Sequence, residues 1–139
     1  MELELIQKFK DIFTGLERAH GVFEKKNEPQ EGVKVEAHMK TVHEPPSIEK
    51  FKKHLLGEYP AMGIVPINDD DKCKFGAIDI DVYPLDYKIL LKKIKQKKFP
   101  LIMCLSKSGG AHLYLFTKQY VSAKDMQTKL SEMATAIGY

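Results

Sequence analysis

Hydrophobic residues near the start of the chain recur at the spacing of one face of a helix, which predicts an amphipathic helix over residues 2–14 that ends near Gly15. Two strands, HGVFEKK and GVKVEAHMKTV, are predicted next, around the polar turn NEPQEG. The hydrophobic positions of the helix are Leu5, Ile6, Phe9, Ile12, Phe13 and Leu16.

A second helix is predicted after Pro45 and Pro46, which break the chain. Ser47 can cap its first turn, and Gly57 closes it. The run MGIVPI then predicts a short strand, and NDDDK predicts a turn. Four residues of this helix are expected to point inward: Ile48, Phe51, Leu55 and Leu56.

The second half of the chain predicts the order strand, helix, strand, strand, helix. KSGG separates the two adjacent strands, so that a glycine-permitted turn can join them as a hairpin. Ser122 and Asp125 form a capping box ahead of the last helix. The elements are strand 76–82, helix 85–98, strands 101–106 and 111–117, and a helix after Ser122.

Both helices of this half carry an inward stripe at helical spacing. In the first helix the remaining positions are mostly lysine, which predicts a basic outer face. The stripes are Tyr87, Leu90, Leu91 and Ile94 in the first helix, and Met126, Leu130, Met133 and Ile137 in the second. The lysines are Lys88, Lys92, Lys93, Lys95, Lys97 and Lys98.

The length of 139 residues suits one ordinary domain. We predict an α+β fold, with an N-terminal α/β part at residues 1–70 and a β-α-β-β-α half at residues 71–139. A four-stranded sheet with two helices on one face needs one more strand, and the chain ends at Tyr139, where that strand would start. We therefore expect the last strand or strands to be missing.

The composition, with 43% hydrophobic and 29% charged residues, is that of a soluble globular protein. No apolar run approaches the roughly 20 residues of a membrane helix, and the acidic N-terminus does not have the pattern of a signal peptide. We therefore expect an intracellular, cytoplasmic protein with no membrane partner. Cys73 and Cys104 lack metal-ligand spacing, so we expect free, mostly buried thiols and no zinc site.

Charge is distributed unevenly along the chain. Residues 1–70 hold 10 Lys or Arg against 13 Asp or Glu, whereas residues 71–139 hold 12 against 6. Two of these six acids are Asp79 and Asp81. If a metal occupies them, the C-terminal half is basic enough to favour an anionic partner, such as nucleic acid or a nucleotide. The alternative is that the lysines only solubilise helix faces.

The segment GAIDIDVY places two acids in an otherwise hydrophobic strand. Because strand side chains alternate, Asp79 and Asp81 leave one face while Ile78 and Ile80 enter the other. Two neighbouring carboxylates suit Mg²⁺ or Mn²⁺ bridged to substrate phosphates. The alternative is that both acids lie on a solvated strand face.

The segment SKSGGAHLYLF contains a glycine-rich turn followed by a histidine. Gly109 and Gly110 allow backbone N–H groups to approach an anion closely. The hydroxyls of Ser106 and Ser108 and the charge of Lys107 add to this phosphate cradle. The alternative is a plain hairpin turn with an incidental histidine, His112.

The two segments are more informative together. In a right-handed strand–helix–strand–strand unit, the first strand and the one after the helix commonly lie close in the sheet. Asp79, Asp81 and His112 can then share a face, with metal ligands and phosphate donors on one cleft. This is the arrangement that nucleotidyl transfer requires.

The segment HLLGEYPAMGIVPINDDDKCKFGAIDIDVY, followed after a helix by SKSGGAHLYLF, resembles the archaeo-eukaryotic primase superfamily over residues 54–116. The resemblance is to its phage and mobile-element primase-polymerase branch, which includes the primase domains of TOTE-type conflict systems. It implies an RRM-like catalytic half in a DNA primase/polymerase, a template-dependent nucleotidyltransferase of DNA replication. The implied partners are a DNA template, a primer and nucleoside triphosphates, and the implied cofactor is Mg²⁺ or Mn²⁺.

The resemblance also assigns roles to residues. Asp79 and Asp81 match the catalytic metal ligands on the first strand of the RRM-like half. His112 matches the catalytic histidine that contacts the phosphates of the incoming nucleotide. Position 110 is Gly where many members carry serine, although the branch named above often has a glycine-rich version. The nucleotide-binding loop is Ser106, Lys107, Ser108, Gly109 and Gly110.

One feature of the superfamily has no counterpart in this chain. The superfamily uses a third carboxylate on a later strand, and this chain ends before such a strand. Asp125 and Glu132 lie on the predicted last helix and are poor substitutes. We therefore expect an incomplete active site that does not polymerise alone, and a helicase or accessory domain beyond Tyr139.

Four further residues are weaker candidates for nucleic-acid or nucleotide contacts. Arg18 and His20, in ERAHGVF, lie at a predicted helix-to-strand junction. The alternative for them is a surface arginine and a packed histidine. Lys92 and Lys95 lie on the lysine-rich helix, which could bind a nucleic-acid backbone by counterion release or serve only as a solvated face.

Two other classes of protein remain open. A non-catalytic RRM-like nucleic-acid-binding module needs stacking aromatics on its exposed sheet face, where Tyr83 and Tyr114 are modest candidates. A metal-dependent nuclease or replication nickase would need a pair of metal-binding histidines and a nucleophilic tyrosine, whereas AHLYLF offers one histidine.

Overall fold

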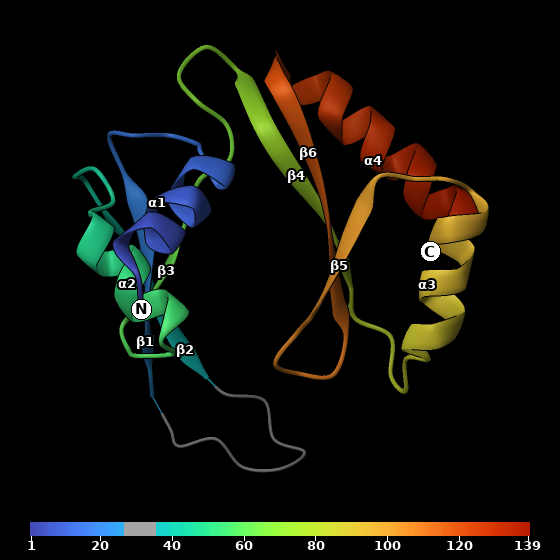
Figure 1. Cartoon of the computed structure of the whole chain (residues 1–139), viewed down its shortest axis with the longest axis horizontal. Coiled ribbons are helices and arrows are strands. Elements are labelled where there is room, and N and C mark those ends of the chain that lie inside the picture. The colour runs from blue at the N-terminus through green and yellow to red at the C-terminus, as the bar shows by residue number, and fades with distance from the viewer. Residues whose placement is uncertain (27–35) are drawn as a thin grey trace. The chain divides into compact units, whose positions relative to one another are not determined.

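The computed structural model describes residues 1–26 and 36–139, so the predicted turn NEPQEG lies outside the described residues. The chain forms two compact units, Met1–Lys72 and Cys73–Tyr139 (Figure 1). That the two together make one domain stays a prediction. Within the described residues the fold is α+β, as predicted, with four helices and two three-stranded sheets.

The N-terminal unit contains a sheet in the strand order β2-β1-β3. Both pairs are antiparallel, with His20 opposite Val42 and Gly21 opposite Gly63. The elements in chain order are α1 (Leu3–Ile12), β1 (His20–Lys25), β2 (Ala37–Val42), α2 (Ile48–Leu55) and β3 (Ala61–Gly63).

The hydrophobic core of this unit is small. Ile6, Phe51 and Met62 are its buried members, and the rings of Phe9 and Phe51 pack edge to face at 6.2 Å. Several residues at the predicted hydrophobic positions of the two helices are exposed, because each helix lies on the surface and buries only a narrow stripe. They are Leu5, Ile12 and Leu56.

Strand β3 is shorter than the predicted strand at residues 62–67. The backbone N–H of Leu16 donates a hydrogen bond of 2.8 Å to the carbonyl of Val65. This carbonyl therefore pairs with the segment after α1 instead of with a neighbouring strand. The cap prediction for α2 is confirmed, since Ser47 Oγ accepts a hydrogen bond of 3.3 Å from the Lys50 amide.

The C-terminal unit confirms the predicted β-α-β-β-α order. Its antiparallel sheet has the order β4-β6-β5, and both helices lie on one face of it (Figure 1). The strand directly after the helix was expected to lie close to the first strand, but the second strand of the hairpin lies between them. The elements are β4 (Lys72–Ile80), α3 (Tyr87–Gln96), β5 (Leu101–Leu105), β6 (Ala111–Ser122) and α4 (Ala123–Ile137).

A continuous core joins the sheet to both helices. Ile80 and Leu113, from two neighbouring strands, pack in one cluster with Leu90 of α3 and Met126 of α4. The predicted stripe of α4 is buried at all four positions, and Ser122 Oγ caps the helix by accepting from the Asp125 amide at 3.4 Å.

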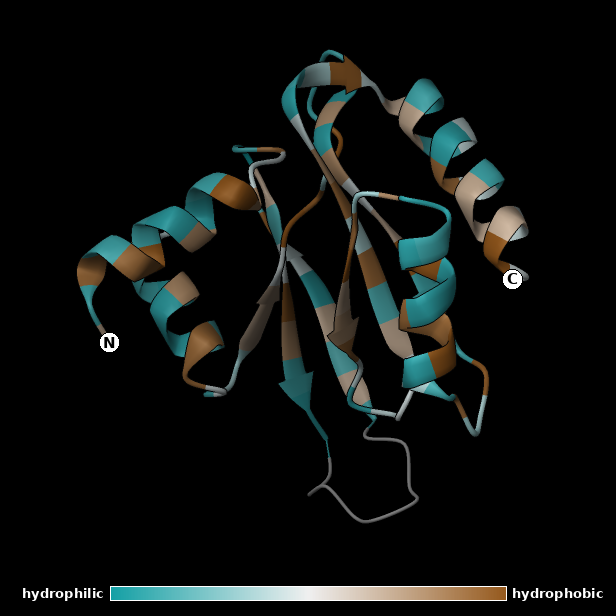
Figure 2. Ribbon diagram, turned by 45° about the vertical axis from the view of Figure 1, so that its right-hand side comes forward, coloured by the Kyte–Doolittle hydropathy of each residue, from teal (hydrophilic) through white to brown (hydrophobic). Residues whose placement is uncertain are grey.

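Helix α3 differs from its predicted pattern at two positions. Leu91, expected inward, is 36% exposed. Lys93, expected outward, is half-buried and donates a hydrogen bond of 3.2 Å to the carbonyl of Ile137 at the end of α4. Hydrophilic and hydrophobic bands alternate along the helices in Figure 2. In the described part of the chain, no helix is long and apolar enough to cross a membrane.

Candidate active site

The predicted metal ligands lie at the end of β4. Ile80 is buried and Ile78 packs against the core, whereas Asp79 points away from the core with a side chain that is 61% exposed. Asp81 is also exposed and directly follows the last residue of the strand. Asp79 is therefore held by the sheet, while Asp81 lies on the segment that leads to α3.

His112 is the second residue of β6, the central strand of the sheet. It lies opposite Cys104 of β5, and its Nε2 is 3.3 Å from Oδ1 of Asp79. This contact becomes an ion pair when the imidazole is protonated. The two segments that carry the predicted chemistry are therefore adjacent, and β6, the second strand of the hairpin, is the one that makes them so.

The turn between β5 and β6 is closed by its own hydrogen bonds. The Ser106 amide donates to the Gly110 carbonyl at 3.0 Å, and the Gly109 amide donates to the Ser106 carbonyl at 3.3 Å. The Gly110 amide donates to Ser106 Oγ at 2.9 Å. Both glycine amides thus have partners inside the loop in this conformation, and their role as anion donors stays a prediction.

The structure accounts for glycine at position 110. A Cβ built there would overlap the backbone carbonyl of Ile80 and would lie 3.2 Å from Ser106 Oγ. The loop therefore packs directly against the end of β4. A serine at this position would require the loop or the strand to move.

Two tyrosines that were not predicted as catalytic, metal-binding or nucleotide-binding residues contact this region, although Tyr83 was a candidate for stacking. The Tyr83 hydroxyl lies 3.0 Å from Oδ1 of Asp81 and 2.8 Å from Oγ of Ser108. The Tyr87 hydroxyl donates to the Gly109 carbonyl at 2.6 Å. Both contacts with the loop join positions more than twenty residues apart in sequence, so no local pattern indicates them.

Aromatic rings follow His112 along the same face of β6. The rings of His112 and Tyr114 are 6.2 Å apart, and those of Tyr114 and Phe116 are 6.0 Å apart. Burial raises the pKa of the Tyr114 phenol above its ordinary value, and the nearby Cys104 and Asp79 raise it further. Tyr114 therefore remains a protonated phenol through neutral pH.

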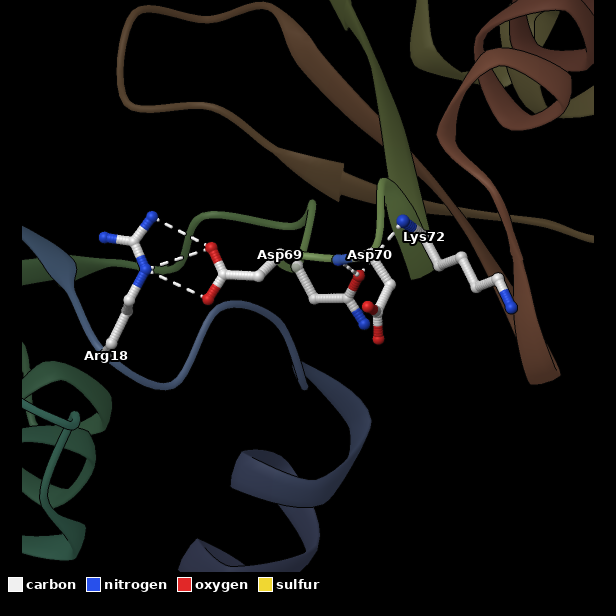
Figure 3. A network of polar contacts seen from close by, with 5 residues as sticks. Arg18, Asp69, Asp70 and Lys72 are labelled. Carbon is white, nitrogen blue, oxygen red and sulfur yellow. Dashed lines mark hydrogen bonds and ion pairs between the residues drawn. The ribbon is translucent and has the colours of Figure 1, made fainter.

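Arg18 lies in the N-terminal unit and is paired with an acid. Its Nε is 3.0 Å from both carboxylate oxygens of Asp69, and one terminal nitrogen is 2.9 Å from Oδ1 (Figure 3). The same turn is closed by Asn68 Oδ1, which accepts 3.0 Å hydrogen bonds from the Asp70 and Lys72 amides. A phosphate bound by Arg18 would have to compete with Asp69.

His20, the other predicted contact in this unit, is fully buried. Its Nδ1 lies 2.8 Å from the Glu44 carbonyl and its Nε2 lies 3.0 Å from Lys50 Nζ. An ammonium group can only donate, so Nε2 accepts and Nδ1 carries the proton. This is the packed histidine of the alternative interpretation, and both ring nitrogens have protein partners.

Lys92 and Lys95 are exposed on α3. They belong to the outer face of this helix, as predicted, and a role in binding nucleic acid stays a prediction. Both cysteines were predicted to be free and mostly buried. Both are free, and Cys73 is buried, but the prediction was wrong for Cys104, which is exposed.

The donor set of Asp79 and Asp81 fits a Mg²⁺ or Mn²⁺ ion. Carboxylate oxygens are the preferred ligands of these cations, which commonly take one or two protein carboxylates and complete their shell with substrate phosphates and water. Within residues 1–26 and 36–139, no group of three His, Cys, Asp or Glu side chains is placed to hold a metal ion.

Comparison with known protein families identifies the chain. Residues 6–137 match the archaeo-eukaryotic primase domain of TOTE conflict systems, and the chain belongs to this family. The match covers both units and agrees with the resemblance on residues 54–116. A comparison with curated proteins finds no match. Family membership indicates a nucleotidyltransferase of primase type, and domains of this superfamily generally depend on divalent metal ions.

Proposed function

We propose that this chain is part of the catalytic core of a DNA primase/polymerase, a template-dependent nucleotidyltransferase. The observation that carries the proposal is the adjacency of its two motifs. Asp79 is 3.3 Å from His112, and Asp81 is linked through Tyr83 to the loop at residues 106–110. The carboxylates and the candidate phosphate-binding groups thus lie at one end of the β4–β6 pair.

In the proposed reaction, the 3′-hydroxyl of a primer attacks the α-phosphate of a nucleoside triphosphate. A new P–O bond forms, the bond to the β-phosphate breaks, and pyrophosphate leaves. Mg²⁺ or Mn²⁺, when bound, would polarise the α-phosphate and favour deprotonation of the hydroxyl. Asp79 and Asp81 would hold the metal.

The remaining residues would orient the triphosphate and balance its charge. Lys107 would bring positive charge to the phosphates and His112 a ring nitrogen that can contact them, and Ser106 and Ser108 hold the loop in its closed form. Holding the reacting groups in line is the main contribution that a protein makes to phosphoryl and nucleotidyl transfer. The DNA template and primer are proposed partners, as is a helicase or accessory domain.

The test is calorimetric titration of the chain with a nucleoside triphosphate, with and without Mn²⁺. We expect Mn²⁺-dependent binding that the Asp79→Asn/Asp81→Asn variant weakens by roughly a hundredfold or more, since loss of an outer partner alone typically costs about 10–100-fold. The matched control is Asp70→Asn/Asp71→Asn, which removes two charges from the N-terminal unit and should bind like the wild type. Folded wild-type protein without metal-dependent binding would contradict the proposal.

A second candidate is a metal-independent nucleic-acid-binding module. The row of rings formed by His112, Tyr114 and Phe116 favours it, because bases stack on aromatic side chains of such sheets. The same titration separates the two candidates when single-stranded DNA replaces the triphosphate. Tight DNA binding without metal that Tyr114→Leu weakens would favour this module, whereas metal-dependent triphosphate binding favours the nucleotidyltransferase.

A further inference from the structure

Tyr83 connects two parts of the candidate site that the sequence treats as separate motifs. Its hydroxyl lies 3.0 Å from Oδ1 of Asp81 and 2.8 Å from Oγ of Ser108. Ser108 Oγ lies 3.2 Å from Ser106 Oγ, which accepts a 2.9 Å hydrogen bond from the Gly110 amide. Four hydrogen bonds thus join the loop backbone to a proposed metal ligand.

The number of available protons gives this series of hydrogen bonds a direction. An ionised carboxylate only accepts hydrogen bonds, and a phenol has a single proton. Tyr83 therefore donates to Asp81 and accepts from Ser108, so the Ser108 proton is used and Ser106 must donate to Ser108. Every bond then points from the Gly110 amide toward the Asp81 carboxylate, which is the arrangement in which successive bonds strengthen one another.

The loop at residues 106–110 is also held from a second side. Tyr87 Oη donates to the Gly109 carbonyl at 2.6 Å. Gly109 has a φ of 93°, which favours glycine, and a Cβ there would lie 3.9 Å from the Tyr83 ring. Tyr83 and Tyr87 thus contact the same turn through their hydroxyls, one at Ser108 Oγ and the other at the Gly109 carbonyl.

Asp81 needs such a restraint more than Asp79 does. Asp79 lies within β4, whose backbone is fixed by pairing with β6, whereas Asp81 follows the end of the strand. The Tyr83 hydroxyl donates a hydrogen bond to the Asp81 carboxylate and can restrain its orientation. Partners of this kind orient metal ligands, and their loss typically lowers metal affinity by roughly 10–100-fold.

We propose that Tyr83 is a positioning residue that couples the orientation of Asp81 to the closed form of the loop at residues 106–110. The proposal rests on the proposed function of the site, since it takes Asp81 as a metal ligand. In this arrangement the loop must be closed for Asp81 to be held ready for metal. Opening of the loop releases the carboxylate.

The first readout needs no metal. Amide hydrogen exchange at Gly110 is measured in the metal-free chain. We expect Tyr83→Phe, Ser108→Ala and Asp81→Ala each to speed this exchange several-fold, because each substitution removes one of the groups in this series of hydrogen bonds. Asp81→Asn keeps an oxygen that can accept from Tyr83, and should therefore restore the slow exchange.

The second readout is the affinity of the protein for Mn²⁺ alone, which is measured by titrating the protein with Mn²⁺. We expect Tyr83→Phe to weaken Mn²⁺ binding roughly tenfold or more, and Asp81→Asn to weaken it while leaving exchange at Gly110 slow. The control is Tyr120→Phe, which removes the hydroxyl of another exposed tyrosine, 45% exposed against 53% for Tyr83. It should change neither readout.

Three outcomes would overturn the coupling: unchanged exchange at Gly110 in Tyr83→Phe, fast exchange in Asp81→Asn equal to that in Asp81→Ala, or wild-type Mn²⁺ affinity in folded Tyr83→Phe. A wild-type chain that binds neither Mn²⁺ nor Mn²⁺–triphosphate would contradict the proposed function instead. In that case the exchange pattern still decides whether Tyr83 links Asp81 to the loop.

Discussion

The two units of the chain are stabilised in different ways. In the C-terminal unit, twelve buried residues form one cluster that joins the sheet to both helices. In the described part of the N-terminal unit the corresponding cluster has three, Ile6, Phe51 and Met62. The buried His20 adds polar contacts to this smaller core through its two partners.

This difference bears on where a site can be built. Side chains that must be held at fixed positions are best placed on well-packed elements. Asp79 and His112 lie on the two neighbouring strands whose opposite faces line the larger core. The N-terminal unit, with its smaller core, is expected to open at lower free energy.

The largest expected effect is on the small core. Phe51→Ala should cost roughly 3–5 kcal/mol, and Leu113→Ala, in the large core, about 2–5 kcal/mol. Because few other buried residues support Phe51, its variant should lose amide protection throughout the N-terminal unit while the C-terminal unit stays protected. Hydrogen exchange resolved by residue measures both variants. Equal loss of protection in both units would show that they unfold together, which would contradict a difference in stability between them.

An intermediate effect is expected at Gly110. Gly110→Ala places a methyl group against the Ile80 carbonyl, and should destabilise the C-terminal unit by about 1–3 kcal/mol, as overpacking does. The matched control is Gly21→Ala in the N-terminal unit, where the nearest atom to a Cβ is 3.6 Å away, an ordinary contact. Urea denaturation measures the free energy of unfolding of both variants. A Gly110→Ala variant as stable as Gly21→Ala would mean that the loop does not pack on β4 as described.

The smallest effect concerns the exposed Arg18–Asp69 pair. The hydrogen bond from Arg18 lowers the pKa of the Asp69 carboxyl below its ordinary value. The pair therefore adds stability above the ordinary carboxyl pKa, and this contribution is lost as the pH falls through the lowered value. Arg18→Gln should raise the pKa of Asp69, as followed by carboxyl NMR, with little change in stability because the pair is solvent-exposed.

High salt should reduce the lowering of the Asp69 pKa in the wild type, because salt screens exposed charges. An Asp69 titration that is identical in wild type and Arg18→Gln would contradict the pairing seen in Figure 3.

Local patterns predicted the C-terminal unit well. The alternation of Ile78, Asp79 and Ile80 correctly assigned the faces of β4, and Ser122 correctly marked the start of α4. These features depend on neighbours in sequence, which a pattern can read. The closeness of Asp79 and His112 followed from the expected sheet, although the wrong strand of the hairpin was placed beside β4.

Features that depend on tertiary contacts were missed. Leu56 and Leu91 fit helical stripes but are exposed, because the width of a buried stripe is set by what packs against the helix. Lys93 looked like one more surface lysine, but it donates to the end of α4. Tyr83 and Tyr87 reach the glycine-rich loop across more than twenty positions of sequence, and no local pattern reports such a contact.

Ser122 is at once the last residue of β6 and the N-cap of α4. The strand and the helix therefore share a residue, and no loop exists between them where extra residues could be added. An insertion there would separate the cap from the Asp125 amide or break the end of the strand. Length variation among relatives should fall in exposed turns and should leave this junction at constant length.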